Sequence, residues 1–148
     1  MKKPRVVRAL HDTVHIHVRF SEVDSMGVVW HGNYVKYLED AREKMGTAQG
    51  MGYMDVYRNG YMIPVVNMNI DYKMPMYYDH PYTIHIWLLD EVAAKIKCYY
   101  EIRNADNQVC VTAETTQVFI DLKGELQLLV PDFYSSWKTD KPWKTAEL

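Results

Sequence analysis

Two residues of this 148-residue chain have the types and the spacing for attack on a carbonyl carbon. Asp24 is a carboxylate in an expected loop, and His31 follows seven residues later, where a helix is expected to begin. The first backbone N–H groups of a helix have no partner within the helix and carry partial positive charge. We therefore expect them to hold the oxyanion that forms when a carbonyl carbon is attacked beside them.

A strand and a loop must bring Asp24 to this position. Apolar and polar residues alternate from Val14 to Phe20, which predicts a strand with one buried face. His15 and His17 share the other face and could bind a metal, but no further ligands stand at a recognisable spacing. A solvent-facing surface is the favoured interpretation. Glu22, the nearest other acid, is interpreted as solvated or structural.

A helix is expected next, starting around His31 and ending near residues 46–52. Its apolar positions recur at intervals of three and four residues, and charged residues fill the opposite side. Asn33 or the residues just before it can cap its start. The expected buried stripe consists of Tyr34, Tyr37, Leu38, Ala41, Met45 and Ala48.

The second half of the chain has the pattern of antiparallel strands. Four runs rich in Val, Ile, Tyr and Thr span residues 62–74, 81–91, 94–104 and 108–122, each bounded by turn residues. One helix and about five strands predict an α+β domain with a twisted sheet curled around the helix. We expect one domain over residues 1–148, a short helical turn at 132–137, and a loosely held lead-in (1–11) and tail (138–148).

Composition excludes several other classes of protein. The net charge of −2 is spread along the chain, so no basic stripe indicates nucleic-acid binding. No run is long enough for a membrane span, and the basic N-terminus lacks the apolar core of a signal peptide. Cys98 and Cys110 lie among apolar strand residues. Two buried free thiols in a cytoplasmic protein are favoured over a disulfide.

The loop and the start of the helix closely resemble a known family. The residues that carry this resemblance are Asp24-Ser25-Met26-Gly27-Val28-Val29-Trp30-His31-Gly32-Asn33-Tyr34, followed by Lys36-Tyr37-Leu38-Glu39 and Ala41-Arg42. They are similar to the signature of 4-hydroxybenzoyl-CoA thioesterases and YbgC-like acyl-CoA thioesterases. Tyr72-Lys73-Met74-Pro75 and Asp121-Leu122-Lys123-Gly124 resemble weaker, later segments of that family.

The resemblance implies the hotdog fold, in which a five-stranded antiparallel sheet wraps around a long central helix. It also implies hydrolysis of an acyl-CoA to a free acid and coenzyme A, with Asp24 as the catalytic carboxylate, either nucleophile or general base. The backbone N–H near His31 would polarise the thioester carbonyl, while the His31 side chain would either assist or only cap and pack. A cytoplasmic homodimer or homotetramer is expected, with no metal or other cofactor, since coenzyme A arrives with the substrate.

Substrate contacts are expected from five further residues: Gly27, Val28, Tyr34, Asn67 and Lys95. Asn67 and Asn69 interrupt an apolar strand, so they either line the acyl pocket or face water at an edge. Lysines and arginines of the strands could meet the phosphates of coenzyme A, although solvated surface charges are the commoner case. These residues are Lys95, Lys97, Arg103 and Lys123.

Three other functions fit the same sequence less well. A thioesterase for acyl carrier protein would need a basic patch at the pocket mouth. A hydratase or dehydratase would pair a catalytic His with an acid in a different loop pattern. A non-catalytic acyl-thioester-binding protein would be unaffected by loss of the Asp24 carboxylate.

Overall fold

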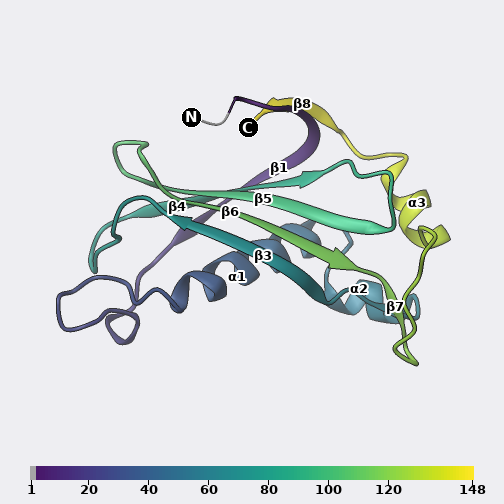
Figure 1. The fold of residues 1–148 in the computed structure, drawn as a ribbon, viewed down its shortest axis with the longest axis horizontal. Coiled ribbons are helices and arrows are strands. Elements are labelled where there is room, and N and C mark those ends of the chain that lie inside the picture. The colour runs from purple at the N-terminus through teal and green to yellow at the C-terminus, as the bar shows by residue number, and fades with distance from the viewer. Residues whose placement is uncertain (1–2) are drawn as a thin grey trace.

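One long helix, α1 (Asn33–Ala48), lies in the hollow of a curved antiparallel sheet (Figure 1). The structure is a computed structural model that describes residues 3–148. The main sheet has six strands in the order β3-β6-β5-β4-β1-β8. Their bounds are β1 Val6–Ile16, β3 Val65–Tyr72, β4 Tyr82–Leu89, β5 Lys95–Asn104, β6 Val109–Val118 and β8 Lys144–Glu147.

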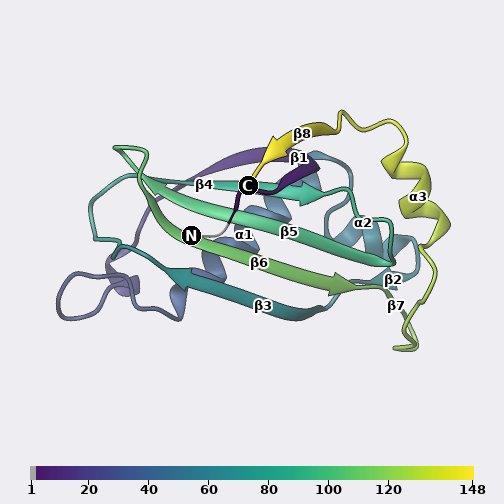
Figure 2. The ribbon, with the colours of Figure 1, turned by 45° about the horizontal axis from the view of Figure 1, so that its top comes forward.

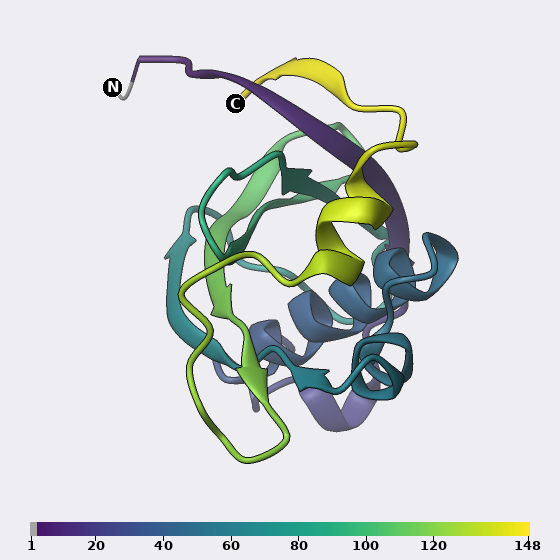
Figure 3. The same cartoon turned by 90° about the vertical axis from the view of Figure 1, so that its right-hand side faces the viewer.

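Smaller elements close the ends of this layered structure. A two-stranded ladder joins β2 (Tyr61–Met62) to β7 (Ile120–Asp121). Short helices follow the first strand (η1, Phe20–Glu22), the central helix (α2, Tyr53–Arg58) and the last hairpin (α3, Asp132–Lys138). Figure 3 shows α3 at one end of the sheet, where the Trp137 indole N–H donates to the Gln49 carbonyl oxygen across 2.7 Å.

The apolar stripe of α1 forms the core together with the inner face of the sheet. Tyr34, Tyr37, Leu38, Ala41 and Met45 are buried as predicted, but Ala48 is exposed because the helix ends there. Along the three middle strands, buried residues alternate with less buried ones. Their buried residues are Tyr82, Ile84, Ile86 and Leu88 on β4, Ile96, Cys98, Tyr100 and Ile102 on β5, and Val111, Ala113, Thr115 and Gln117 on β6.

The first strand lies earlier in the chain than its alternation pattern predicts. β1 ends at Ile16, and the chain then turns away, so Phe20 lies in η1 and is 76% exposed. The expected burial of Phe20 is therefore wrong. Within the predicted lead-in, only residues 1–2 lie outside the described chain, and β1 already begins at Val6.

The predicted loose tail is wrong as well. Residues Lys144–Glu147 form β8, which pairs antiparallel with Val6–Ala9 of β1, so the first and last strands lie side by side (Figure 2). This pairing makes six strands instead of the expected five. A ladder of backbone hydrogen bonds does not require apolar side chains, and a charged edge strand is tolerated because its outer side faces water.

Two further expected strands are divided. Pro64, which has no backbone N–H, separates β2 from β3 in the run predicted at 62–74. The run at 108–122 divides into β6 and β7 at Phe119, which is fully buried. The short helix predicted at 132–137 is confirmed as α3.

The remaining expectations concern the cysteines and the membrane. Cys98 and Cys110 are buried free thiols, which confirms the prediction of two buried thiols over a disulfide. None of the helices between residues 3 and 148 has the length and apolar character needed to cross a membrane.

Candidate active site

Asp24 and His31 line the same pocket at the N-terminal end of α1. This pocket has a volume of about 360 Å³ and lies between the 24–34 segment and the chain that leaves β3. Its remaining lining residues are Val28, Val29, Trp30, Tyr34, Tyr72, Lys73, Met74 and Pro75. The tertiary structure therefore joins the predicted carboxylate and the predicted helix start in one cleft.

The Asp24 side chain folds its own loop with one oxygen. Oδ1 accepts hydrogen bonds from the backbone N–H of Met26 at 2.8 Å and of Val28 at 3.2 Å. Gly27, between them, has φ +75°, a conformation that residues with a Cβ adopt at a cost. The second carboxylate oxygen, Oδ2, has no hydrogen-bond partner among the described residues. One oxygen is thus structural, and the other is available for chemistry.

Unpaired backbone donors are present at the start of α1. Gly32 precedes the helix, and no side chain caps it, so the N–H groups of His31 and Gly32 have no partner within residues 3–148. No acidic side chain occupies the first turn. Of the expected caps, Asn33 or a residue just before it, the structure has Gly32 at the N-cap position, and the Asn33 side-chain amide donates instead to the Glu22 carbonyl oxygen at 2.9 Å. The helix start is therefore free to bind an oxyanion.

The His31 side chain is exposed and packs against Trp30, with ring centroids 4.9 Å apart. It makes no capping hydrogen bond to the helix. Its carbonyl oxygen accepts a hydrogen bond from the Tyr72 hydroxyl at 3.1 Å. This bond connects the end of β3 to the start of the helix.

Aromatic rings form the inner wall of the pocket. Tyr34 is buried and lies edge-on to Tyr72, with centroids 5.1 Å apart. Burial raises the pKa of Tyr34, so its hydroxyl remains protonated at neutral pH. Behind it, the Tyr37 hydroxyl donates to Glu22 Oε1 at 3.1 Å, and burial, reinforced by Glu22, raises the pKa of Tyr37. Glu22 is therefore structural, one of its two expected roles.

Three predicted substrate contacts lie outside this pocket. Gly27 shapes the loop, and its carbonyl oxygen accepts from the Tyr78 N–H at 3.1 Å without lining the cleft. Asn67 is exposed on β3, where it accepts a hydrogen bond from the Asn69 amide at 3.0 Å. Of its two expected positions, the structure shows the one that faces water.

Lys95 lies at the far end of the sheet. Strand pairing aligns Tyr72 at the pocket with Val111 and Ile102, whereas Lys95 pairs with Val118. Seven residues of extended strand separate Ile102 from Lys95, roughly 23 Å at about 3.3 Å per residue. The other expected cations are elsewhere too: Lys97 pairs with Glu91, Arg103 pairs with Glu101, and Lys123 is exposed in a hairpin.

Sequence reasoning did not assign roles to Tyr72 and Lys73, although both occur in a segment that resembles the family. Lys73 is the lysine that lines the cleft. The register that brings the end of β3 beside the helix start depends on pairing between distant strands, which a local pattern does not contain. No group of three or more potential ligands suited to a metal ion occurs in the described part of the chain.

A curved antiparallel sheet around one long helix defines the hotdog class of α+β proteins, and this chain shares that fold with a solved thioesterase. The chain belongs to the thioesterase-like superfamily, whose sequence model matches residues 18–138. The expected family and the expected enzyme class, a thioester hydrolase, are confirmed by this membership.

Individual relatives agree with this classification. The Bacillus subtilis (strain 168) protein YneP, named as a candidate acyl-CoA thioesterase, is 29% identical over 130 residues, which cover 85% of this chain and 94% of that protein. A DHNA-CoA thioesterase structure from Staphylococcus aureus has a TM-score of 0.76 and 26% identity, covering 86% of this chain and 89% of that one. Slr0204, a 1,4-dihydroxy-2-naphthoyl-CoA thioesterase from Synechocystis, shares the fold with a TM-score of 0.76 at 22% identity, covering 88% and 96%.

Proposed function

We propose that this chain hydrolyses the thioester bond of an acyl-CoA, and that Asp24 and the start of α1 carry out the reaction. The observation that carries the proposal is the shared pocket, which is lined by Asp24, with its free Oδ2, and by His31, whose backbone N–H is unpaired. The N–H of Gly32, the next residue, is also unpaired. The names of the relatives, which include acyl-CoA thioesterases and hydrolases, support the substrate class.

In the general-base route, Asp24 takes a proton from water while the water oxygen attacks the thioester carbon. The carbonyl oxygen becomes an oxyanion, and the N–H groups of His31 and Gly32 stabilise it. When the tetrahedral intermediate collapses, the C–S bond breaks and the coenzyme A thiolate leaves. A thiol has a pKa of about 8.5, so departure requires no strong general acid.

In the nucleophilic route, Oδ2 of Asp24 attacks the carbonyl carbon directly. The C–S bond breaks to release the thiolate, and an anhydride joins the acyl group to Asp24. Water then hydrolyses this anhydride to the free acid and restores the carboxylate. Both routes use the same two groups of the protein.

Lys73 supports the choice of coenzyme A as the leaving group. Lys73 lines the cleft, and a phosphate of the cofactor portion would pair with its ammonium group. The acyl group we expect is small to medium or aromatic, since Tyr34, Tyr72 and Met74 offer an apolar wall.

The test compares Asp24→Asn with Asp121→Asn. Asn retains an oxygen that can accept the loop hydrogen bonds, but it cannot act as a base or a nucleophile of comparable strength. Asp121 is a matched control because its Oδ1 also accepts two backbone N–H groups, those of Lys123 and Glu125, both at 2.9 Å. We expect kcat for a panel of acyl-CoAs, measured by thiol release, to fall at least about 100-fold in Asp24→Asn only.

Equal activity in the two variants would refute the role of Asp24. Rapid hydrolysis of acyl-carrier-protein thioesters with none of acyl-CoA would refute the substrate class.

A homo-oligomer is the assembly that we infer. β3 stands at one edge of the main sheet, with no strand on its outer side in the described chain, and Val66 on it is 58% exposed. An exposed edge of this kind pairs readily with another strand. Antiparallel pairing of β3 with a second copy would place the end of one strand, and its pocket, beside the start of the other.

A charge on this edge provides the test. Val66→Lys should shift the protein toward the monomer in sedimentation experiments, because a lysine disfavours edge pairing. An unchanged sedimentation coefficient would refute assembly through β3. The cytoplasmic location remains a prediction.

A further inference from the structure

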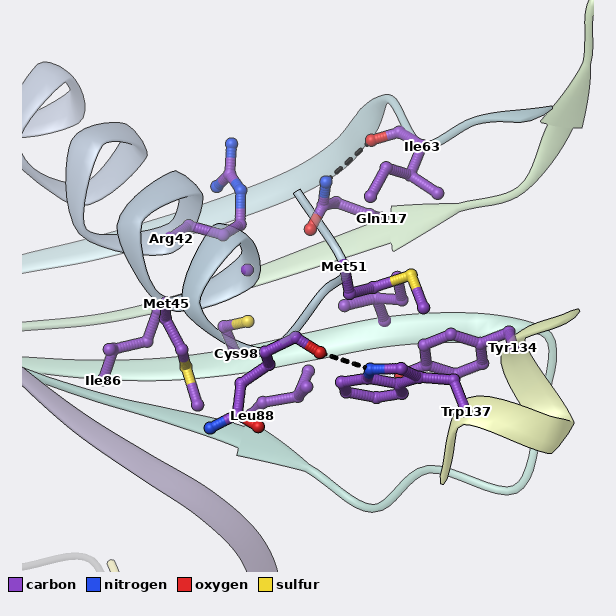
Figure 4. A pocket seen from close by; sticks show the side chains of 13 residues that line it. Arg42, Met45, Met51, Ile63, Ile86, Leu88, Cys98, Gln117, Tyr134 and Trp137 are labelled. Carbon is purple, nitrogen blue, oxygen red and sulfur yellow. Dashed lines mark hydrogen bonds between the residues drawn. The ribbon is translucent and has the colours of Figure 1, made fainter. Parts of the chain in front are cut away.

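A second candidate site lies at the opposite end of α1. A small, partly open cavity of about 40 Å³ is lined mainly by apolar side chains from α1, α3 and the sheet, among them Met45, Leu88, Tyr134 and Trp137 (Figure 4). Its lining shares no residue with the Asp24 pocket. Along α1, Asn33 and Met45 are twelve residues apart, roughly 18 Å at about 1.5 Å per residue.

One polar atom in this cavity lacks a partner. Gln117 is only 4% exposed, and its Oε1 has no hydrogen-bond partner in the part of the chain that the structure describes. The other end of the same amide is fixed, because Nε2 donates to the Ile63 carbonyl oxygen at 2.7 Å (Figure 4). Rotating the amide would lose that bond and turn two oxygens toward each other. The orphan oxygen is therefore held in place as an acceptor.

The neighbouring polar group is a cation. Arg42 lines the cavity and donates through Nη1 to the Tyr100 hydroxyl at 3.2 Å, which is its one recorded hydrogen bond among the described residues. A guanidinium has five N–H donors, so Arg42 retains capacity for an acceptor. Cys98, also in the wall, stays an uncharged thiol because burial raises its pKa to about 11.

An open groove of about 660 Å³ adjoins the cavity. Arg42, Met51, Ile63 and Gln117 line both spaces, so the groove and the cavity adjoin at these side chains. The groove has the volume of a typical small-molecule site, about 300–1,000 Å³, whereas the cavity holds only a few water-sized groups. Together they fit an elongated ligand whose narrow end reaches Gln117.

We propose that this groove and cavity bind an apolar ligand that ends in a hydroxyl group, with Gln117 Oε1 accepting the hydroxyl proton and Arg42 donating to the hydroxyl oxygen. A carboxylate fits less well, because it has no proton for Oε1. The groove is also lined by three acids, Glu39, Asp40 and Glu43, against the single cation Arg42. The ligand class is therefore an uncharged alcohol.

Two sources can present such a group. One is the acyl chain of a thioester held at the Asp24 pocket of a second copy, since pairing through β3 would bring that pocket near Ile63 and Pro64; this source rests on the proposed function. The other is a free alcohol, which requires no catalysis. The same hydrogen bonds would recognise both.

The free-ligand arm uses two isomers, octan-1-ol and heptyl methyl ether, with the full-length protein. They have equal numbers of heavy atoms, but only the alcohol can donate to Gln117. We expect octan-1-ol to bind at least about 5-fold more tightly, as measured by calorimetry, and this preference to disappear in Gln117→Leu. The control, Gln127→Leu, removes an amide that also donates to a backbone carbonyl, that of Glu125 at 3.0 Å, but lies outside the cavity.

The thioester arm compares ω-hydroxyacyl-CoAs of six, eight and ten carbons with the acyl-CoAs in which a methyl replaces the hydroxyl. If the acyl chain is the source, the ratio of kcat/KM for the two series falls at least about 5-fold in Gln117→Leu, and Gln127→Leu leaves it unchanged. Absence of thioesterase activity would refute the proposed function, while the calorimetric experiment would still decide whether the groove and cavity bind an alcohol.

A measurement on the wild-type chain covers the case in which Gln117→Leu fails to fold. The Gln117 side-chain amide resonances should shift on addition of octan-1-ol and not on addition of heptyl methyl ether. The proposal is overturned if neither arm shows a hydroxyl preference that depends on Gln117, the result expected when only water occupies the cavity. Tighter binding of octanoate than of octan-1-ol would also overturn it.

Discussion

The Tyr72 hydroxyl donates a hydrogen bond to the His31 carbonyl oxygen across 3.1 Å. It joins the last residue of β3 to the turn that precedes α1, two segments 41 residues apart in the chain. The N–H groups proposed to bind the oxyanion belong to that same turn. The bond therefore ties the position of these donors to the sheet.

Removing this bond should weaken both activity and stability. In Tyr72→Phe the ring contact with Tyr34 remains, but the turn loses one anchor. We expect unfolding to become easier by about 0.5–1.5 kcal/mol and kcat to fall several-fold, because misplaced donors stabilise the oxyanion less well. Tyr57→Phe is the control, since its exposed ring stacks on Tyr53 and lies away from the cleft. Equal kcat values in the two variants would show that Tyr72 does not position the turn.

Gly27 offers a way to strain the loop that holds Asp24 without steric collision. Its φ is +75°, and a Cβ built there meets nothing within 4 Å. Gly27→Ala should cost about 1–2 kcal/mol of stability through the backbone alone, and it should lower kcat by shifting Asp24. Gly124→Ala is matched to it, because φ is +85° there and the space is equally open. We expect similar melting temperatures for both variants and a loss of activity only for Gly27→Ala.

Substitution of Lys73 should weaken coenzyme A binding, whereas substitution of Lys95 should not. Lys73 lines the cleft, whereas Lys95 stands at the far end of β5. Lys73→Met should raise KM for an acyl-CoA by about 3- to 10-fold with kcat nearly unchanged, and the effect should shrink at high salt. Lys95→Met should leave KM unchanged. Steady-state kinetics at two ionic strengths would separate them, and a larger effect at Lys95 would contradict the site described above.

A histidine pair on the outer face of the sheet predicts acid sensitivity. His11 Nε2 lies 3.0 Å from His85 Nδ1, so one ring must be neutral to accept the hydrogen bond. Burial lowers the pKa of both rings below the ordinary 6.5, and Arg103 lowers both further against opposing contributions from Glu101 and, for His11, Asp12.

The direction of the pH dependence follows from these pKa values. His11 and His85 bind protons more strongly in the unfolded chain than in the folded chain. The contribution of the pair to the free energy of unfolding is therefore fully present above about pH 6.5, and it is lost as the pH falls through the lowered folded-state pKa. His85→Gln should reduce this loss between pH 7 and pH 5 in denaturant titrations. His17→Gln, outside the strands, should retain it. Identical pH profiles for the two variants would exclude the pair as the cause.

Most of the architecture was predictable from the order of residue types. The three- and four-residue spacing of Tyr34, Tyr37 and Leu38 identified α1, and runs rich in Val, Ile, Tyr and Thr between turn residues identified β4 and β5. These patterns are local, and burial of one face requires them wherever the element packs. The Asp24–His31 segment was found in the same way, because a carboxylate, a glycine turn and a helix start lie within eleven residues.

The tertiary structure decided which distant residues join that segment. The pairing of β3 with β6 brings Tyr72 and Lys73 to the cleft and leaves Asn67 and Lys95 outside it. The C-terminal tail, which was expected to be loosely held, is a sixth strand because β8 pairs with β1. Register between strands depends on many weak contacts across the whole sheet, and no single stretch of sequence contains them. The sequence by itself thus determined the chemistry available at the helix start, and the fold determined which side chains surround it.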